Sequence, residues 1–556
     1  MEADVSSCRH QVVEEALKKN GFKLPSFPNT NCVLIWQTFT SSLDVAQIGR
    51  LKSWQRINRF PGMNQIAMKD SMTRNLTEMA NKFPDEFDFF PKSWVLPQDR
   101  EQVTAYHKMA ENRSQQYYIV KPSDQSCGTG IWLTNNISDL AVRKSLFYSK
   151  TNNCVIQEYI DDPFLIDGFK SDIRIYALVT SCDPLRVYLY NDGIVRLATA
   201  QYQAPTVKNQ GNIFMHLTNY SVNKSSSKFD EGDAEGYSGN KRSLAQLFNH
   251  LRQTHQCDVN ALKNRIQDIV LKTIIAVEPH LFVNYRNVRP NDHISNGSVC
   301  FQLLGLDIIL DSNFKPWLLE VNGSPSFGTE TELDQMIKGN LLQDTFKLLN
   351  VSPMDRDMSV AIHSCVAKRR LAAPSAKFHR TKSSDPIFPA TRVEKLEQLH
   401  RQLFRIRHES AKDHFDFENR GNFDRIFPPE LRNMQWHYGE MIVEAFKTLQ
   451  PVRSQRFMAE IETTYCQIPD EFELIQKIQL LNSSSSNTID GGSASLANVR
   501  NSEIKLMYQY LEEKYKDNLE DQVEPGWKSI LEKSNRSQTA RVRSRSLKSA
   551  KIQFSN

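Results

Sequence analysis

The sequence lacks the patterns that mark membrane-spanning, disulfide-rich and zinc-binding proteins. Its 556 residues contain no apolar run of about 18 residues, the length that a membrane-spanning helix needs. Its nine cysteines include no CxxC pair and no Cys/His cluster at the spacing of a zinc site. The beginning, MEADVSSCRHQVVEEALKKN, carries acidic residues and no continuous apolar core, unlike a secretory signal. We therefore expect a reducing, cytosolic compartment and no membrane partner.

Acidic residues are absent from two basic segments. The formal net charge of +5 is small for this length, so the total charge alone predicts no polyanionic partner. Residues 358–384, however, contain six Lys or Arg and no Asp or Glu, and residues 533–556 contain seven and none. The first segment is interpreted as a cationic surface, with a solvated linker or a nuclear-localisation-like run as the alternative. The second is interpreted as a disordered basic tail.

Composition divides the chain into six stretches. After an N-terminal segment, residues 1–30, residues 31–350 mix strand and helix signals, which predicts an α/β (α+β) domain. Residues 355–480 are charged and mostly helical in pattern. The segment NSSSSNTIDGGSAS, residues 482–495, is a Ser/Gly linker with too little apolar surface to pack. Residues 496–532 predict one amphipathic helix before the basic tail, residues 533–556.

A predicted hairpin brings two carboxylates together in the mixed domain. CFQLLGLDIILDSNFKPWLLEVN, residues 300–322, reads as two apolar strands joined at DSNF. A turn centred between Asn313 and Phe314 places Asp307 opposite Glu320, and the period of two places Asn322 on the same face. Facing carboxylates need a cation, and oxygen ligands favour magnesium. In the alternative Glu320 is solvated and Asp307 ends a strand, but Asp307 lies within LLGLDIIL.

A second pattern supplies phosphate-binding chemistry, which a magnesium ion with few protein ligands usually requires. YYIVKPSDQSCGTGIWL, residues 117–133, predicts a strand ending at Lys121, a small-residue loop with Gly128 and Gly130, and another strand. Lysine offers positive charge, and glycines let backbone amides approach a phosphate closely. The loop lacks the GxxxxGK[ST] pattern of a Walker motif, so a simple hairpin turn remains the alternative.

The next strands add cations to the same predicted sheet. The strand NCVIQEYI ends at residues 157–160 with an edge suited to a purine. Further on, Lys170, Asp172 and Arg174 alternate and therefore share one face of a strand. We expect a hairpin that turns at residues 191–193 and places Arg196 near its exit. A solvated sheet face is the alternative, but it does not explain why so many charges converge with Asp307 and the residues around it.

These blocks resemble, in order, the tubulin tyrosine ligase-like family of ATP-grasp enzymes. The resemblance covers roughly residues 50–350 and continues more weakly to RGNFDRIFPP. Within the family, the blocks are most similar to the autonomous polyglutamylases, which add glutamates to tubulin tails. The blocks are QRINRFPGMNQIAMKD, FPKSWVLP, IVKP, VIQEYIDDPFLIDGFKSDIRIYALVTSCDPLRVYLYNDGIVRLAT, MHLTNYSVNK, GNKRSL and LLEVNGSPSF.

The resemblance implies a fold with N-terminal, central and C-terminal lobes, followed by a helical basic extension with a cationic microtubule-binding segment at about residues 358–384. It implies ATP and Mg²⁺ as cofactors, and catalytic roles for Arg174, Lys170 and Glu320. The implied ATP contacts are Lys121, Gly128, Thr129, Gly130, Gln157, Glu158, Tyr159, Ile160, Lys170, Asp172, Thr218 and Asn219. The implied magnesium ligands are Asp307, Glu320 and Asn322, and the implied contacts to the glutamate donor are Arg196, Tyr220, Ser221, Lys241 and Gly323.

Two positions depart from the family pattern. Gly323 stands where related enzymes often carry His or Arg, which leaves the start and the extension of glutamate branches both open. Thr129 replaces a basic residue that is often found between the loop glycines. The partners implied are free glutamate, tubulin C-terminal tails and microtubules, with a monomeric chain in the cytoplasm on the cytoskeleton, including the cilium axoneme or basal body. Other acceptors, another amino acid or a non-catalytic microtubule-binding role are the alternatives, and no pattern favours nucleic acid.

Overall fold

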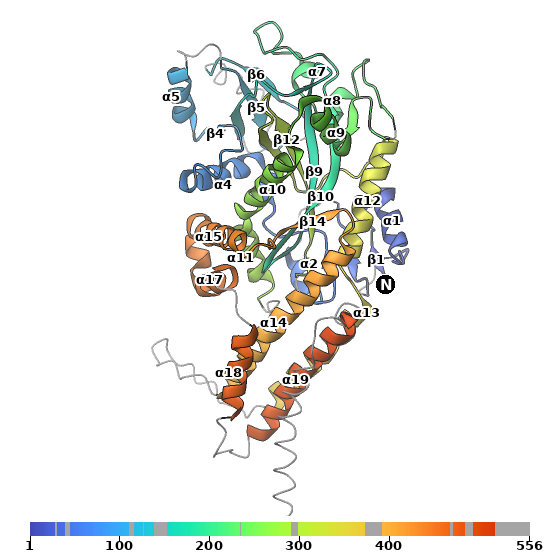
Figure 1. Ribbon diagram of the computed structural model, residues 1–556, viewed down its shortest axis with the longest axis vertical. Coiled ribbons are helices and arrows are strands. Elements are labelled where there is room, and N and C mark those ends of the chain that lie inside the picture. The colour runs from blue at the N-terminus through green and yellow to red at the C-terminus, as the bar shows by residue number, and fades with distance from the viewer. Residues whose placement is uncertain are drawn as a thin grey trace, which may run out of the picture. The chain divides into compact units, whose positions relative to one another are not determined.

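The computed structural model describes residues 1–27, 31–38, 45–110, 116–125, 127–137, 153–233, 235–290, 298–372, 392–466, 471–483 and 493–516. The chain forms two compact units, Met1–Val351 with Arg420–Gln467 and Ser352–Asn419 with Ile468–Asn556. Figure 1 shows the helices and strands of both units. Within the described residues, no helix is both long and apolar enough to cross a membrane.

A large antiparallel sheet organises the first unit (Figure 1). Its strands follow the order β11 (Lys241–Ser243), β10 (Leu185–Leu197), β9 (Phe169–Cys182), β12 (Gln302–Leu310) and β13 (Pro316–Asn322). Two further strands join it, because β8 (Leu165–Ile166) pairs with β9 and β14 (Phe423–Phe427) pairs with β10. All nine residues of β12 are buried, which explains their nearly continuous apolar run.

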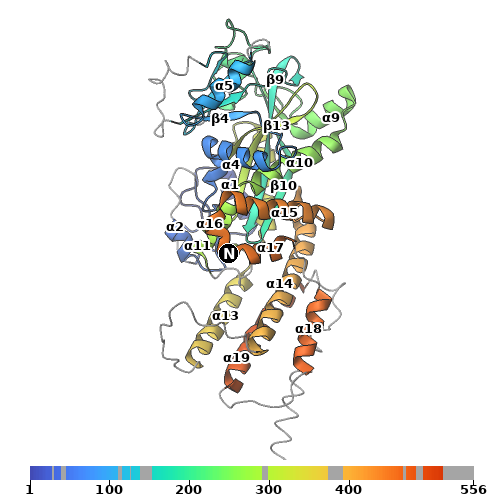
Figure 2. The same ribbon diagram turned by 90° about the vertical axis from the view of Figure 1, so that its left-hand side faces the viewer.

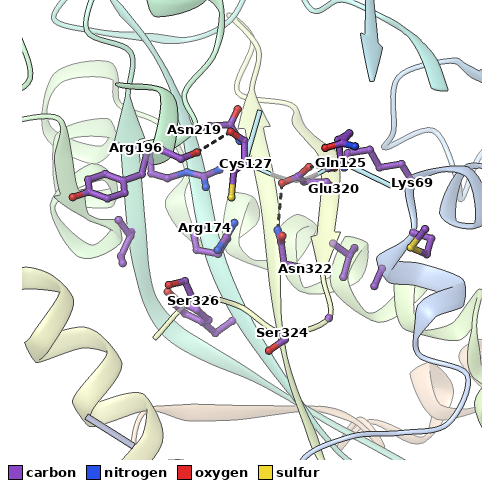
Figure 3. Close-up of a pocket in the computed structure, with 18 of the residues that line it drawn as sticks. Lys69, Gln125, Cys127, Arg174, Arg196, Asn219, Glu320, Asn322, Ser324 and Ser326 are labelled. Atoms are coloured by element: carbon purple, nitrogen blue, oxygen red, sulfur yellow. Dashed lines mark hydrogen bonds and ion pairs between the residues drawn. The ribbon is translucent and has the colours of Figure 1, made fainter. Parts of the chain in front are cut away.

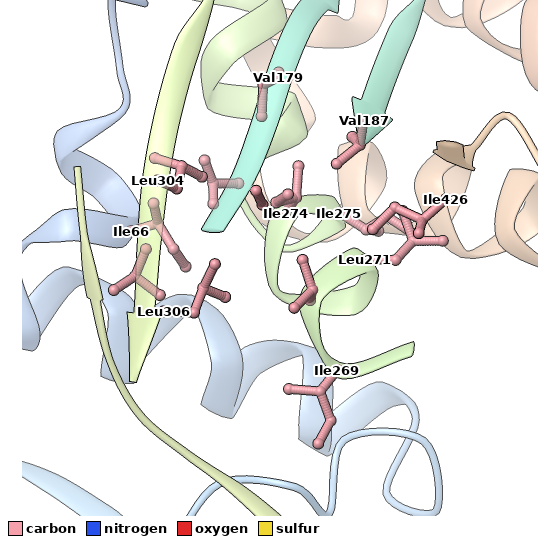
Figure 4. Packing of buried hydrophobic residues seen from close by; sticks show 14 of the residues in the cluster. Ile66, Val179, Val187, Ile269, Leu271, Ile274, Ile275, Leu304, Leu306 and Ile426 are labelled. Carbon is pink, nitrogen blue, oxygen red and sulfur yellow. The ribbon is translucent and has the colours of Figure 1, made fainter. Parts of the chain in front are cut away.

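Helices cover both faces of this sheet. One core joins the sheet to α10 (Val259–Ile275) and α11 (Glu278–Val288), and Figure 4 shows Leu304 and Leu306 of β12 near the isoleucines of α10. The core on the other face includes apolar residues of α1 (Gln11–Lys19) and α12 (Glu332–Leu348). Since strand side chains alternate between faces, Ile173 and Ile175 lie in the first core, as their spacing predicts.

Two smaller sheets complete the first unit. A four-stranded antiparallel sheet has the order β4 (Ser93–Leu96), β7 (Cys154–Glu158), β5 (Tyr118–Pro122) and β6 (Trp132–Thr134). A parallel sheet contains β1 (Ala3–Asp4), β2 (Leu34–Ile35) and β3 (Arg56–Ile57). The predicted mixed α/β class is therefore confirmed, whereas its division into three ATP-grasp lobes stays a prediction.

The remaining helices of this unit are α2 (Val45–Arg50), α3 (Asn64–Ala67), α4 (Lys69–Lys82), α5 (Arg100–Ala110), α7 (Ile213–His216), α8 (Tyr220–Asn223), α9 (Leu244–His255), α15 (Arg432–Leu449), α16 (Pro451–Ser454) and α17 (Met458–Cys466), with a 3₁₀ turn, η3 (Gln455–Phe457), between the last two.

The β12–β13 hairpin has the predicted pairing for a partly different reason. Asp307 lies opposite Glu320, but near the turn Leu310 pairs with Pro316, which centres the turn on Asn313. The register then shifts between Asp307 and Ile308, so Leu319 is an extra, bulged residue. Without this bulge Asp307 would face Leu319. The bulge therefore determines that the two carboxylates meet.

The turn predicted at residues 191–193 is wrong, because these residues lie inside β10. The hairpin turns earlier, where Cys182 pairs with Leu185. The register with β9 instead shifts between Leu189, which pairs with Ala177, and Gly193, which pairs with Ile175. A Cβ atom on Gly193 would lie 2.5 Å from the carbonyl oxygen of Arg174, so glycine permits this close approach of the strands. Arg196 still enters the predicted site, because it pairs with Asp172 across the same two strands.

The second unit consists of helices, labelled in Figure 2. They are α13 (Pro353–Ala372), α14 (Arg392–Asn419), α18 (Glu471–Ser483) and α19 (Ser493–Lys514). Asp355 at the start of α13 is buried and pairs with Lys514 and the Tyr510 hydroxyl of α19. The helical stretch predicted at 355–480 is interrupted, because Arg420–Gln467 belong to the first unit.

Several predicted segments fall partly outside the described residues. Of the basic segment 358–384, residues 358–372 lie in α13 and the rest fall outside the described residues. Of the linker predicted at 482–495, only residues 482–483 and 493–495 are described. Of the helix predicted at 496–532, residues 496–516 are described. The basic tail 533–556 lies wholly outside the described residues.

Candidate functional site

Two adjoining cavities lie at the polar face of the large sheet. The larger has a volume of about 600 Å³ and the smaller about 70 Å³. Both are lined by Asn219 and Glu320, so these two residues lie at the boundary between them. Figure 3 shows the larger cavity, with Arg174, Arg196 and Glu320 directed into the same space. The charged residues predicted on the sheet face therefore surround cavities instead of bulk solvent.

A buried ionic cluster joins three strands at the centre of the site. Arg174 on β9 donates from Nε and Nη2 to the two carboxylate oxygens of Asp307 on β12, the second bond being 3.0 Å long. Arg196 on β10 binds Asp172 through two hydrogen bonds of 2.6 and 2.7 Å and lies 2.9 Å from Asp307. Burial alone would raise the pKa of Asp307, but the two arginines outweigh it and hold that pKa well below its usual range.

Glu320 and Asn322 extend this cluster along β13. Asn322 Nδ2 donates to Glu320 Oε1 at 3.3 Å, which confirms that the two side chains share a face (Figure 3). On the other side, Lys69 at the start of α4 places Nζ 4.0 Å from Glu320 Oε2 and donates to the carbonyl of Gln125 at 2.8 Å. A cation from outside the sheet therefore approaches this carboxylate as well.

The donor set around Asp307 and Glu320 fits magnesium. Two carboxylates face each other in register, and a half-turn of the neighbouring Asn322 amide presents its oxygen as a third ligand of the hard type that Mg²⁺ prefers. No group of three or more Asp, Glu, His or Cys side chains able to hold a metal occurs among the described residues. A magnesium ion held by Asp307, Glu320 and Asn322 would therefore need further oxygen ligands, such as water or phosphate.

The smaller cavity is lined by both aliphatic and charged side chains. Ile119 on β5, Ile131 just before β6, Leu217 and Ile309 contribute aliphatic surface to it. Lys121 also lines it, and its Nζ donates to Gln157 Oε1 at 2.7 Å and to the carbonyl of the bulged residue 319 at 3.4 Å. Burial lowers the pKa of Lys121 to about 8.

A hydrogen-bond chain fixes the second buried lysine of this cavity. Lys170 Nζ donates to the Tyr159 hydroxyl at 2.8 Å, and the hydroxyl lies 3.0 Å from His216 Nδ1. The other ring nitrogen, Nε2, is 3.2 Å from the carbonyl of Asn209, which can only accept, so Nε2 carries the proton. Nδ1 therefore accepts from Tyr159. Burial is the main reason that the pKa of Lys170 falls to about 7 and that of His216 to about 4.

The glycine loop forms the β5–β6 hairpin connection and also lies beside the cavities. Gly128 and Gly130 have φ angles of +80° and +71°, which other residues rarely adopt. A Cβ atom on Gly128 would lie 2.8 Å from Val222, so the loop packs closely on α8. The Ser221 hydroxyl donates to the carbonyl of Cys127 at 2.8 Å and ties the two together. The loop is thus both a hairpin turn and a wall element.

The structure brings most predicted site residues to one of the two cavities. Of the twelve predicted nucleotide contacts, all but the loop residues 128–130 line the smaller cavity, and Thr129 is exposed. The Glu158 carboxylate also accepts a hydrogen bond from Tyr106 at 2.7 Å. The residues predicted to bind the donor all line the larger cavity: Arg196, Tyr220, Ser221, Lys241 and Gly323.

Sequence reasoning missed several residues of the site. Lys69 lies in the quoted block QRINRFPGMNQIAMKD but was assigned no role. His216 is the second residue of the block MHLTNYSVNK, and its spacing in the sequence does not predict a contact with Tyr159. Asp334 and Lys338 form an i,i+4 pair on α12, a pattern that usually marks a solvated helix face. Only the fold shows that this pair lines the larger cavity.

Comparison with known proteins agrees with this geometry. The sequence profile of the tubulin-tyrosine ligase family matches residues 49–359. The chain is 36% identical over 483 residues to tubulin polyglutamylase TTLL7 of Homo sapiens, covering 86% of this chain and 53% of that relative. It is 41% identical over 353 residues to tubulin polyglutamylase TTLL6 of Mus musculus, covering 64% of this chain and 40% of that relative.

The chain spans about half the length of the curated relatives that it matches first. The family profile, in contrast, covers 311 of its 556 residues, and that span contains all the residues that line the two cavities. Because more than half of the chain matches this profile, the chain belongs to the tubulin-tyrosine ligase family.

Proposed function

We propose that this chain is an ATP-dependent ligase that joins glutamate to glutamate side chains in tubulin C-terminal tails. One observation carries the proposal. Facing carboxylates, Asp307 and Glu320, line a small cavity with buried lysines, and Glu320 also lines the larger, cation-lined cavity beside it. This arrangement suits a nucleotide on one side, its terminal phosphate at the carboxylates and an acidic amino acid on the other side. The names of the relatives, tubulin polyglutamylases, support the choice of tubulin.

The proposed reaction must first convert a carboxylate into an electrophile. Transfer of the γ-phosphoryl group of ATP to the acceptor's γ-carboxylate breaks a P–O bond, releases ADP and forms an acyl phosphate. The neutral α-amine of glutamate then attacks the acyl carbon, the C–N bond forms, and inorganic phosphate leaves as the amine loses a proton. Positioning and charge stabilisation lower such barriers most effectively.

Each group in the site has a proposed task in this sequence. Lys121 and Lys170 bind nucleotide phosphates from the smaller cavity, and Arg174 stabilises charge on the transferred phosphoryl group. Asp307, Glu320 and Asn322 would hold Mg²⁺, which when bound neutralises charge on the phosphate oxygens. The guanidinium of Arg196 and the ammonium of Lys241 attract the carboxylates of the donor. Gly323 offers no side chain, so at this position only the backbone and neighbouring groups can contact the glutamate donor.

The decisive test is ATP-dependent incorporation of labelled glutamate, glycine and tyrosine into microtubules by the purified chain. We expect glutamate alone to be incorporated, and the variant Glu320→Gln to be inactive but folded, because it keeps shape and loses one metal-binding charge. Mass spectrometry of the tails then distinguishes single additions at new sites from longer chains. Incorporation of another amino acid, or equal incorporation by Glu320→Gln, would refute the assignment. Microtubule binding without any incorporation would favour a non-catalytic role.

We further propose that the basic segment at residues 358–384 binds the acidic microtubule surface. Its described part belongs to α13, where Lys368 is exposed. Exposed charges are screened over about 8 Å at physiological ionic strength, so binding must weaken as salt is added. Co-sedimentation with microtubules at increasing salt, comparing the chain with a variant whose Lys and Arg in this segment are replaced by Gln, tests this. Salt-independent binding would contradict it. A cytoplasmic location on microtubules, including those of cilia, is part of this proposal.

A further inference from the structure

The wall of the larger cavity formed by α12 holds two lysines around one carboxylate. Lys241 on β11 donates to Asp334 Oδ2 at 2.5 Å, and Lys338, one turn further along α12, lies 2.7 Å from Asp334 Oδ1. The Lys241 ammonium also lies 3.6 Å from the centre of the Tyr220 ring. All three charged side chains line the cavity. One carboxylate therefore holds two ammonium groups side by side at the cavity wall.

This cluster is buried and carries one excess positive charge. Lys241, Asp334 and Lys338 have exposed fractions of 4%, 1% and 6%. Burial alone would raise the pKa of Asp334, but the two lysines outweigh it and leave that pKa lowered. Two cations share this single anion, and Glu330, which also lines the cavity, is exposed to water. A buried excess charge is costly unless a counter-ion balances it, so the cluster favours an added anion.

The lysines retain hydrogen-bonding capacity for such an anion. An ammonium group has three donors. In the described part of the chain, Lys338 uses two of them, on Asp334 and on the carbonyl of Gly328. Lys241 donates to Asp334 and otherwise faces the aromatic ring of Tyr220. A carboxylate can therefore bridge the two ammonium groups from the cavity side without displacing Asp334.

The positions of Arg196, Lys241 and Lys338 along the cavity wall indicate which carboxylate of a glutamate donor the two lysines would bind. Arg196 touches Asp307 directly, whereas Lys241, its register partner on β11, and Lys338 contact Asp334 instead. Of these three cations, Lys241 and Lys338 thus lie on the side away from Asp307. In an amino-acid donor the α-carboxylate is one carbon from the reacting amine, whereas the side-chain carboxylate of glutamate lies farther away. The lysine pair, which does not contact Asp307, therefore suits the side-chain carboxylate of glutamate.

We propose that Lys338, held beside Lys241 by Asp334, is a specificity-determining residue that binds the side-chain carboxylate of a dicarboxylic amino-acid donor. This inference rests on the proposed function and adds a residue to it. Asp334 acts as a positioning residue that sets the separation of the two ammonium groups. The pair distinguishes glutamate from its uncharged amide, glutamine, which has the same size but cannot balance the excess charge.

Calorimetric titration of the full chain with glutamate and glutamine, in the presence of a non-hydrolysable ATP analogue and Mg²⁺, tests this without turnover. We expect wild-type chain to bind glutamate more tightly than glutamine. In Lys338→Met the affinity for glutamate should fall by about tenfold to a hundredfold, the range expected for a lost charged hydrogen bond. Glutamine binding should change little, so the preference for glutamate over glutamine should shrink. Lys338→Arg should retain most of this preference.

A matched control and a kinetic readout separate recognition from structure. Lys347 lies on the same helix, is exposed and does not line the cavity, so Lys347→Met should leave both affinities unchanged. With microtubules as acceptor, Lys338→Met should raise KM for glutamate while KM for ATP stays constant. An unchanged preference for glutamate in a folded Lys338→Met, or a wild-type chain that binds both amino acids equally, would overturn the inference. If wild-type chain binds glutamate selectively but modifies no tubulin, the proposed function fails while this inference stands.

Discussion

The hydrogen bond between Tyr159 and His216 predicts the protonation state of the His216 ring. His216 is 1% exposed, its Nδ1 accepts from Tyr159, and its Nε2 donates to a backbone carbonyl. A second proton on Nδ1 would face the Tyr159 hydroxyl, which already accepts from the Lys170 ammonium. Burial, with a smaller contribution from Lys170, lowers the pKa of His216 from 6.5 to about 4. The side chain should therefore be neutral throughout the physiological range.

The shift has a definite sign for stability. Between pH 6.5 and 4 the unfolded chain binds a proton at this position and the folded chain does not. The free energy of unfolding therefore keeps its full contribution from His216 above pH 6.5 and loses it as the pH falls towards 4. From pH 7 to 5 this loss amounts to about 2 kcal/mol. His280, whose pKa burial also lowers to about 4, adds a similar loss elsewhere.

The variant His216→Phe isolates the effect. Phenylalanine keeps a ring against Tyr159, but the hydroxyl loses its acceptor, so we expect a cost of about 1–3 kcal/mol at pH 7. Since His280 remains in both proteins, the difference in stability between wild type and variant should shrink by about 2 kcal/mol from pH 7 to 5. Urea unfolding at the two pH values measures this. NMR of ¹³C-labelled histidines, assigned by the resonance missing in the variant, gives the titration directly. A midpoint near 6.5 would refute the reasoning.

Two further predictions concern folding outside the cavities. A Cβ atom on Gly421, which has a φ of +55°, would lie 2.2–2.5 Å from the Asp344 carboxylate, so Gly421→Ala should lower the midpoint of thermal unfolding by a few degrees (~2 °C for each kcal/mol in a unit of this size). Gly211→Ala, whose Cβ would meet nothing within 4 Å, is the matched control, and equal midpoints for both would contradict the clash. In the second unit, Asp355→Asn removes the charge that binds Lys514, so amides of α19 should exchange hydrogen faster while those of β12 do not change. Unchanged exchange in α19 would show that apolar packing alone holds that helix.

Local patterns predicted the strand faces well. The alternation of Lys170, Asp172 and Arg174 against Ile173 and Ile175 reappears in the structure as a polar cluster on one side and a core on the other. This succeeded because the period of two is a property of the strand backbone and does not depend on its neighbours. The glycine loop was predictable for a similar reason, since its positive φ angles are a local demand.

Turn and register were predicted less well. The sequence NDG at residues 191–193 is a strong turn signal, yet β10 continues through it because β9 and α9 provide partners on either side. The Asp307–Glu320 pairing was predicted with the turn centred half a residue too far along, and the bulge at Leu319 restored it. The bulged residue is contacted by Lys121 from another sheet, and neither the bulge nor this contact follows from local spacing.

The sequence by itself determined the class of fold, the strand faces and the set of charged residues that meet at the carboxylate pair, because these follow from short-range periodicity and from resemblance to a family. Only the tertiary structure decided which distant residues complete the site. Lys241 and Asp334 are 93 positions apart, and Tyr159 and His216 are 57 apart, so no local pattern connects them. Their contact exists because helices and strands pack around a shared core, and that packing depends on the whole chain at once.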